Sequence, residues 1–358
     1  MIDAAGIWAV VQELVSARGP CGQEDEVRTV CQAYLQELCD ETWVDRAGNA
    51  VGLLRGQASA DQGAAIRVMA HMDELSMVVK RINPDGTLRV NPLGGIYPGN
   101  FGQGPVEILG DGGILPGVLG AGPMHITPET NKGWAIKPNG GDKAPDWDHV
   151  YVVTRKSPDE LKAAGVHAGT RVVVAQSRRA LFEVGDAMAG YFLDDRVAVA
   201  MMLGAASLLK AAGVCPPADV YLVCTTLEEI GAHGAAYAAR TLPGDTTLAL
   251  DVGPATAEYG IQLGPAPVVV YGDRVGLYDK GVSDRLLACG RALGLDPQCA
   301  YWQGYASDAS IAKSYGHTAR SGLLCIATEN THGYEMVLKD GLWQCARLLA
   351  AYLEQPEG

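Results

Sequence analysis

Two hydrophobic patterns follow one another over the first 75 residues. Residues 5–18 and 23–39 place apolar side chains at helical spacing, and "GPCG" separates them. The stretch "ETWVDRAGNAVGLLRG" then predicts a hairpin that turns at Gly48 and Asn49. The next stretch, "AAIRVMAHMD", is apolar almost throughout as far as His71, as expected of a strand that is covered on both faces.

The pattern changes after residue 75 to short segments separated by turns. "MVVKRINPDGTLRV" and "PVEILGDGGILPGVLG" each predict a hairpin, and "HVYVVTRK" and "TRVVVAQ" predict further strands. Only "SPDELKAAG" predicts a helix in this part of the chain. Many short strands with little helix are typical of a small β-barrel or sandwich.

From about residue 185, helical and strand patterns alternate again. "DDRVAVAMMLGAASLLKAAG" predicts a helix and "ADVYLVCTT" a buried strand, and the alternation continues to the end. Such alternation predicts a mostly parallel sheet between layers of helices. We therefore expect an α/β domain made of residues 1–75 and 185–358, interrupted by a β-rich insert of residues 76–184.

Composition excludes several classes of partner. The net charge of −13 argues against nucleic acid and anionic membranes. No apolar run is long enough to span a bilayer, and the N-terminus lacks the pattern of a signal peptide. The nine cysteines are scattered without a CxxC pair, which indicates reduced thiols and a cytoplasmic protein.

Histidine or carboxylate residues follow the apolar runs of the predicted sheet. They are, in chain order, His71 with Asp73, Asp194 with Asp195, Glu228 with Glu229, Asp251, and Glu329 with His332 and Glu335. In an open α/β sheet, ligands bind beyond the carboxyl ends of the strands. This set of residue types is the one expected for Zn²⁺ or Co²⁺ with positions open to water and substrate.

Each of these groups also has an ordinary structural explanation. A lone histidine after a strand is usually a hydrogen-bonded loop residue, and Asp194 or Asp195 before a helix could be an N-cap. Asp251 before Gly-Pro suits a turn, and the Glu228–Glu229 pair suits a solvated face. The metal hypothesis gains weight because all of these strand ends belong to one predicted sheet.

The spacing within two of the groups adds a physical argument. Residues i and i+2 of a strand face the same side, so His71 could bind a metal while Asp73 accepts its other N–H. Two adjacent carboxylates could supply one metal ligand and one general base. Because neighbours on a strand point to opposite faces, we predict that the strand ends at or before Glu228.

Six segments of the chain resemble, in the same order, the motifs of metallopeptidase family 42. This family contains the tetrahedral (TET) aminopeptidases, including glutamyl aminopeptidases. The segments are "AHMDE" (70–74), "LDDRVA" (193–198), "EEIGAHGA" (228–235), "ALDVGPA" (249–255), "SDASIA" (307–312) and "THGYE" (331–335). "LPGVLGAGPMH" (115–125) is similar to part of the family's inserted dimerisation domain.

The resemblance implies a zinc-exopeptidase-like α/β fold and a two-metal hydrolase that removes N-terminal residues from short peptides. It implies two Zn²⁺ or Co²⁺ ions, Asp194 as the ligand that bridges them, Glu228 as the general base and Asp73 as the residue that orients His71. It also implies a homo-oligomer in which dimers assemble into a tetrahedral dodecamer. The five implied metal ligands are His71, Asp194, Glu229, Asp251 and His332.

Departures from the family pattern concern the substrate side. "GYASDA" (304–309) stands where the family commonly has a glycine-rich segment, and Asp195 stands where many members have Asn. Candidate substrate-binding residues are therefore Asp195, Tyr305 and Asp308, although Asp195 could instead cap a helix. Two alternatives stay open, a related two-metal deacylase and a homologue that has lost its chemistry.

Overall fold

The computed structural model describes residues 1–57 and 65–355 and divides them into two compact units. The first unit comprises Met1–Glu74, Leu181–Thr331 and the chain from Glu335 onward. The second comprises Leu75–Ala180 together with the short segment His332–Tyr334. The insert ends four residues before the expected boundary of 184 because residues 182–184 form a strand that pairs within the first unit.

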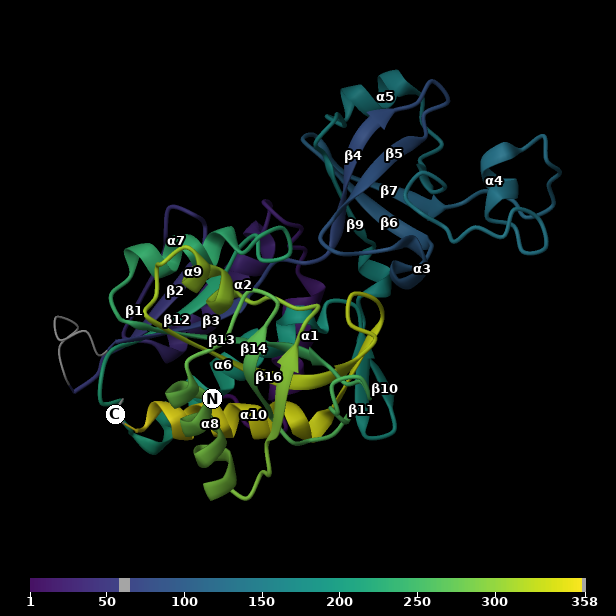
Figure 1. The fold of residues 1–358 in the computed structure, drawn as a ribbon. Helices are drawn as coiled ribbons and strands as arrows, with labels where there is room; N and C mark the ends of the chain where they lie inside the picture. The colour runs from purple at the N-terminus through teal and green to yellow at the C-terminus, as the bar shows by residue number, and fades with distance from the viewer. Residues whose placement is uncertain (58–64, 356–358) are drawn as a thin grey trace. The chain divides into compact units, whose positions relative to one another are not determined.

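The described residues of the first unit form an 11-stranded sheet (Figure 1). Along one path the strand order is β1-β2-β12-β3-β13-β16-β17-β11-β10, and β14 pairs with both β15 and β16. The strands are β1 (Glu41–Val44), β2 (Ala50–Leu54), β3 (Ile66–His71), β10 (Phe182–Val184), β11 (Ala187–Gly190), β12 (Val220–Thr225), β13 (Thr246–Pro254), β14 (Val268–Asp273), β15 (Gln298–Trp302), β16 (Arg320–Glu329) and β17 (Glu335–Leu338).

The core of this sheet is parallel, which confirms the predicted fold class. Strands β12, β3, β13 and β16 are parallel neighbours, whereas β1, β2, β17, β11 and β10 add antiparallel edges. Short connections such as Asp45–Asn49 permit only a hairpin, while parallel pairing requires a longer crossover. The predicted hairpin at Gly48 and Asn49 is the β1–β2 pair.

Helices cover both faces of the sheet (Figure 1). Helices α1, α2, α6, α8 and α10 share one apolar core with the strands, and α7 and α9 pack on the opposite face. Helix α6 is buried on nearly all sides, so its sequence shows no polar face. The helices are α1 (Ile7–Ser16), α2 (Asp25–Leu38), α6 (Leu193–Ala212), α7 (His233–Thr241), α8 (Lys280–Ala292), α9 (Asp308–Ser314) and α10 (Lys339–Leu353).

The second unit is a closed six-stranded barrel, as the sequence pattern predicts. Its strand order is β4-β5-β8-β7-β6-β9. The strands are β4 (Ser76–Ile82), β5 (Leu88–Leu93), β6 (Gly104–Gly110), β7 (Gly113–Gly120), β8 (Tyr151–Val153) and β9 (Arg171–Val174), and the short helices are α3 (Pro98–Phe101), α4 (Asn131–Ala135), α5 (Pro158–Ala163) and a 3₁₀ turn (Gln176–Arg178). Across residues 1–57 and 65–355, no helix is long and apolar enough to cross a bilayer.

Candidate metal centre

The parallel register brings the candidate ligands of the first unit to one edge of the sheet. Strand β3 ends at His71, which pairs with Thr225 at the end of β12. Asp194 and Asp195 lie at the beginning of α6, which packs against β3 and β13. Asp251 lies within β13, three residues before that strand ends at Pro254, and so it is not the turn residue that its Gly-Pro context allowed.

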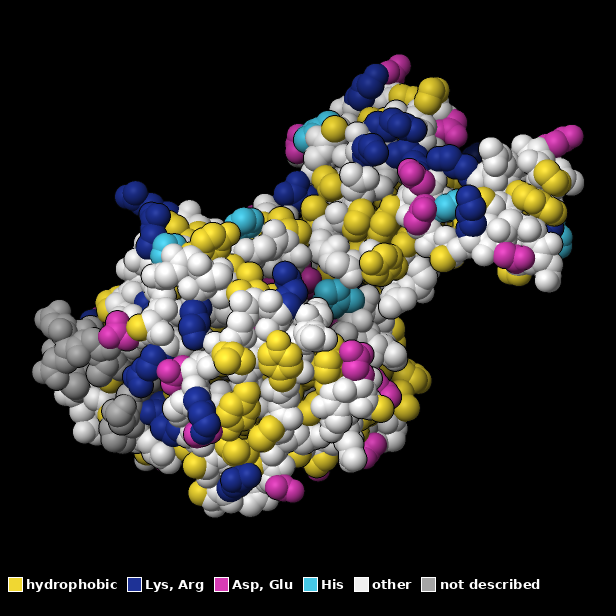
Figure 2. All heavy atoms as spheres, viewed as in Figure 1, with side chains coloured by type: hydrophobic (Ala, Val, Ile, Leu, Met, Phe, Trp, Pro, Cys, Tyr) yellow, Lys and Arg dark blue, Asp and Glu magenta, His cyan; other side chains and the backbone are white. Residues whose placement is uncertain are grey.

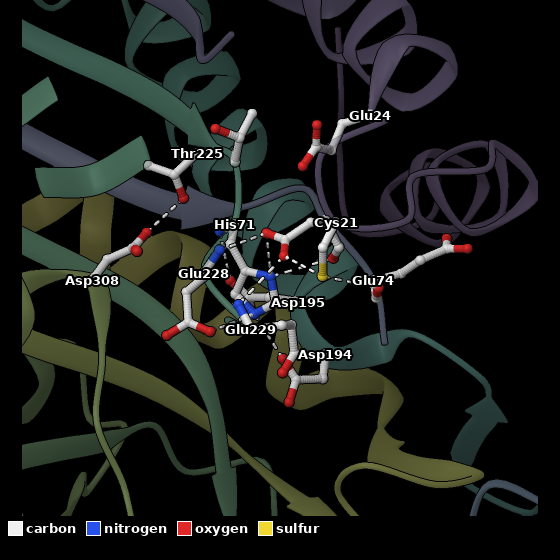
Figure 3. A network of polar contacts seen from close by, with 12 residues as sticks. Cys21, Glu24, His71, Glu74, Asp194, Asp195, Thr225, Glu228, Glu229 and Asp308 are labelled. Carbon is white, nitrogen blue, oxygen red and sulfur yellow. Dashed lines mark hydrogen bonds and ion pairs between the residues drawn. The ribbon is translucent and has the colours of Figure 1, made fainter. Parts of the chain in front are cut away.

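Side chains from these segments converge on His71 in two overlapping groups. His71, Asp195 and Asp251 form one group, and His71, Asp194 and Glu229 form the other. Within each group the potential ligand atoms lie within 4.8 Å of one another. The Nε2 atom of His71 is 2.9 Å from Oδ1 of Asp194. Figure 3 shows Asp194, Asp195 and Glu229 gathered beside this imidazole.

His332 lies outside both groups. The segment to which it belongs is part of the second unit, although its sequence neighbours on either side belong to the first. Its Nδ1 is 2.9 Å from the carbonyl oxygen of Gly95, and a Cβ atom at Gly95 would lie 3.2 Å from the same nitrogen. Because a carbonyl only accepts, Nδ1 of His332 must carry the proton, which leaves the neutral ring with its lone pair on Nε2.

The electrostatics of the two groups favour a bound cation. Burial raises the pKa values of Asp195, Glu228 and Glu229, and neighbouring carboxylates add to the rise. Burial, followed by the charge of Asp194, raises the pKa of Asp251 to about 8. Burial alone would lower the pKa of His71, but its bonds with Asp194 and Asp73 raise it well above the ordinary value.

A divalent ion fits this donor set. Several carboxylates are buried around one imidazole, and buried charge is costly unless it is paired or coordinates a metal. The Oδ1 atom of Asp195 is buried and, within the described part of the chain, has no hydrogen-bond partner. Carboxylate oxygens with an imidazole nitrogen are ligands that suit Zn²⁺ and Co²⁺.

Asp73 connects the end of β3 to the loop that follows β12. Its carboxylate accepts hydrogen bonds from the backbone N–H of Glu228 at 3.0 Å and of Glu229 at 3.3 Å. Its Oδ1 atom is 3.5 Å from Nδ1 of His71. Strand β3 ends at His71, so Asp73 lies beyond the strand, and strand alternation does not explain its contact with His71. Its position depends instead on these contacts to the neighbouring loop.

Glu228 and Glu229 lie beyond the end of their strand, as predicted. Strand β12 ends at Thr225, and a turn with positive φ at Leu227, Gly231 and Ala232 follows. The backbone N–H groups of Gly231 and Ala232 donate to the carbonyl of Glu228 at 2.9 and 3.0 Å. Because the chain is no longer extended, both glutamates can face the same site.

Two residues support the site through roles that the sequence did not predict, although Glu335 was among the carboxylates found there. Asn49 accepts from the backbone N–H of Thr226 at 3.0 Å and donates to the carbonyl of Gly234 at 3.0 Å, so it fixes both ends of the glutamate loop. Glu335 accepts from the backbone N–H of Asp194 at 2.9 Å. The motif "THGYE" contains Glu335, but no sequence signal marked Asn49 beyond its place in a hairpin turn.

The structure gives no support to the N-cap explanation of Asp195. No side chain caps the beginning of α6, and Asp194 and Asp195 both have non-helical backbone angles. The Asp195 carboxylate is fully buried and accepts from the backbone N–H of His71 at 3.2 Å. Asp195 is therefore held against the end of β3, inside one of the two groups.

The other two substrate candidates differ in where their polar atoms point. The hydroxyl of Tyr305 donates to the carbonyl of Val252 at 2.9 Å, and its ring packs 5.0 Å from the ring of Trp302. Asp308 lies at the first turn of α9, and its Oδ2 accepts from the hydroxyl of Thr225 at 2.5 Å (Figure 3). Burial raises the pKa of Asp308 to about 6.

Comparison with known proteins decides the family. Residues 48–348 match the model of the M42 glutamyl aminopeptidases. The chain belongs to this family. It is 30% identical over 247 residues to lysyl aminopeptidase of Pyrococcus furiosus, an alignment that covers 68% of this chain and 66% of the relative.

Solved structures give the same result for the fold. An aminopeptidase of the archaeon Desulfurococcus kamchatkensis superposes with a TM-score of 0.86 at 26% identity, covering 98% of this chain and 95% of the other. The Pyrococcus horikoshii TET1 peptidase superposes with a TM-score of 0.82 at 21% identity, covering 97% and 99%. Membership of the M42 family confirms the predicted enzyme class, a metal-dependent aminopeptidase.

Asn49→Ala tests how the glutamate loop is held. The substitution leaves the buried N–H of Thr226 and the carbonyl of Gly234 without their partner, and we expect it to lower the free energy of unfolding by about 1–3 kcal/mol. Peptide turnover should fall with it, because the loop carries Glu228 and Glu229. Denaturant unfolding and a peptidase assay measure both effects. The same substitution at exposed Asn100 is the control, and equal effects at the two positions would contradict this role.

Proposed function

We propose that the protein removes the N-terminal residue of short peptides at a centre of two divalent ions, Zn²⁺ or Co²⁺. The observation that carries the proposal is the pair of ligand groups that share His71 within a buried cluster of acids. The chemistry that such ions supply when bound is polarisation of a carbonyl group and acidification of water. The residues that would hold the ions are His71, Asp194, Glu229, Asp251 and His332.

Asp194 is suited to contact both ions. Its carboxylate lies 2.9 Å from His71 and shares a ligand group with Glu229. Its charge is also the largest electrostatic influence on Asp251, which belongs to the other group. Its backbone N–H donates to the carboxylate of Glu335, and this contact fixes the position of its backbone. A carboxylate between two groups can bridge two cations.

Glu228 is suited to move the proton. Its Oε2 atom is 3.9 Å from Nε2 of His71, yet the residue belongs to neither ligand group. Asp73 holds its backbone, and the side chain is only partly buried, so water can reach it. A carboxylate beside the ligands that is not itself a ligand can take a proton from water and deliver it to the leaving amine.

Asp308 is our candidate for binding the free amine of the substrate. One of its oxygens accepts from Thr225, whereas its buried Oδ1 has no hydrogen-bond partner among the residues that the structure describes. Its charge also acts on Glu228, so the two carboxyl groups are neighbours. An ammonium group offers three donors to such an oxygen. The hydroxyl of Tyr305, by contrast, donates to the carbonyl of Val252 and lies beside the carboxyl group of Asp251.

Glu228→Gln should abolish most of the turnover while metal content stays unchanged. Replacing the carboxylate with an amide keeps the shape of the side chain but removes the proton acceptor. We therefore expect turnover to fall about 10²–10⁴-fold. The measurement combines elemental analysis with hydrolysis of a peptide with a free N-terminus, with Zn²⁺ and Co²⁺ supplied separately.

The neighbouring Glu229→Gln is the matched control, because the same change there should reduce metal content as well as turnover. Loss of metal in Glu228→Gln would make Glu228 a ligand and overturn its assignment. An N-acetylated copy of the peptide completes the experiment. Preferential hydrolysis of that copy would favour a deacylase, and no hydrolysis of either peptide by the metal-loaded protein would favour a homologue that has lost its chemistry.

His332→Ala should lower metal content to about one ion per chain, since we propose this imidazole as a ligand of one of the two ions. Elemental analysis after dialysis against buffered Zn²⁺ measures the change. His167→Ala provides the control, because His167 is an exposed histidine of the same unit that pairs with Asp111. Two ions per chain in the His332 variant would remove this residue from the ligand set.

We further propose that barrels of neighbouring copies pair to form dimers, and that the dimers assemble into a tetrahedral dodecamer in the cytoplasm. Strand β7 exposes Ile114 and Val118, at 47% and 50%, and Figure 2 shows apolar side chains over the barrel near β6 and β7. Contiguous exposed apolar surface commonly marks an interface between proteins. The solved structure of the Pyrococcus horikoshii TET1 peptidase describes assembly into a tetrahedron or a large octahedral shell.

Val118→Asp should shift the protein to smaller assemblies. The added charge would be buried without a partner at the proposed dimer contact, which is unfavourable. Light scattering coupled to size-exclusion chromatography measures the mass. The control is Val44→Asp, at a position that is 40% exposed in the other unit. A Val118→Asp protein that keeps the mass of the unmodified protein would place the interface elsewhere.

A further inference from the structure

A buried ion pair is formed by two residues that directly follow the candidate site residues in the sequence. The Nη2 atom of Arg196 is 2.9 Å from Oε2 of Glu74, and neither side chain is exposed. Arg196 follows Asp195 on α6, and Glu74 follows Asp73 beyond β3. In Figure 3 the side chain of Glu74 extends away from His71. The pair is therefore adjacent to two ligand-bearing segments without taking part in either ligand group.

Stability is a poor explanation for such a pair. Removing two charges from water costs several kcal/mol per ion, and apolar side chains of similar volume often serve a protein core as well or better. The described chain has many apolar side chains packed in the same core as α6, so an apolar pair would match its surroundings. A positional role explains why charges are used where apolar side chains would pack.

The pair links the two segments through atoms that are not candidate ligands. The segments are also joined from the N–H of His71 to Asp195 and from Nε2 of His71 to Asp194. Both contacts involve carboxylates of the ligand groups, and the second uses the imidazole nitrogen that would bind a metal ion instead. The contact between Glu74 and Arg196 needs no ligand atom, so it can keep the spacing of the segments with or without bound ions.

The N-terminal segment Gly19–Cys21 packs against this pair. The carbonyl of Gly19 accepts from the N–H of Glu74 at 2.8 Å, and a Cβ atom at Gly19 would lie 2.7 Å from Nη2 of Arg196. The thiol of Cys21 lies 3.2 Å from Oδ2 of Asp73. A third segment of the chain thus packs closely on the guanidinium and on the carboxylate that holds the glutamate loop.

We propose that Glu74 and Arg196 form a buried clamp that sets the distance between the His71–Asp73 segment and the Asp194–Asp195 segment. The inference rests on the proposed two-metal function. Both are positioning residues, which act through the ligands and do not touch the substrate. The clamp tunes metal affinity, because side chains that orient metal ligands typically change affinity 10–100-fold when they are replaced.

The test removes both charges at once. Glu74→Gln combined with Arg196→Met keeps the approximate volumes and leaves no isolated buried charge, whereas Arg196→Met alone would strand Glu74 and risk misfolding. We expect the double variant to melt near the temperature of the unmodified protein. Its affinity for Zn²⁺, measured by competition with a chromophoric chelator, should fall about 10–100-fold, and the visible spectrum of its Co²⁺ form should change.

Two further proteins complete the experiment. Arg196→Lys retains the charge but loses the planar guanidinium, so its Zn²⁺ affinity should lie between those of the unmodified protein and the double variant. Arg18→Met combined with Glu26→Gln neutralises a partly exposed pair with a contact of 3.0 Å in the same unit, and it should leave affinity and spectrum unchanged.

Unchanged Zn²⁺ affinity and Co²⁺ spectrum in the Glu74–Arg196 double variant would overturn the clamp, whatever its melting temperature. A lower melting temperature with normal affinity would show a structural role only. If the double variant did not fold, Arg196→Lys would decide, because unaltered affinity and spectrum there would also overturn it. Failure of the unmodified protein to take up Zn²⁺ would instead contradict the two-metal centre itself, which separates the two hypotheses.

Discussion

The concentration of buried carboxyl groups around one imidazole is the constraint on which the site depends. Asp194, Asp195, Glu229 and Asp251 all approach His71 at the edge of the sheet, where little water remains to solvate them. Such an arrangement is unfavourable for an isolated polypeptide and favourable once divalent cations are bound. The rest of the first unit can be understood as the scaffold that keeps these carboxyl groups together against their mutual repulsion.

That scaffold combines strand pairing, side chains that bind the backbone, and the packing of a buried helix. The parallel pairing of β3 with β12 aligns His71 with Thr225. Asn49 and Asp73 then fix the glutamate loop that follows β12. The largely buried helix α6 supplies two of the carboxylates from its first residues, so their position is tied to the packing of the whole core. Rigid elements of this kind hold ligands more reproducibly than a mobile loop.

The sequence allowed the fold to be predicted, and it marked the residues that the structure groups around His71, for a physical reason. Apolar runs that end in His or Asp mark the carboxyl edge of a parallel sheet, and this rule located His71, whereas Asp194 and Asp195 begin α6 after an antiparallel strand. The same rule put the end of a strand at Asp251, whereas β13 continues to Pro254, because a long apolar strand carries no local signal for its end. Asn49 and the contact between Glu335 and Asp194 were beyond prediction, since they depend on segments more than 140 residues apart.

Asp73 binds the backbone of two successive residues that have different proposed tasks. Because one carboxylate accepts from both N–H groups, the backbones of Glu228 and Glu229 can shift only together, and a backbone movement of the proposed proton carrier would also displace the proposed ligand. The two tasks are therefore mechanically coupled.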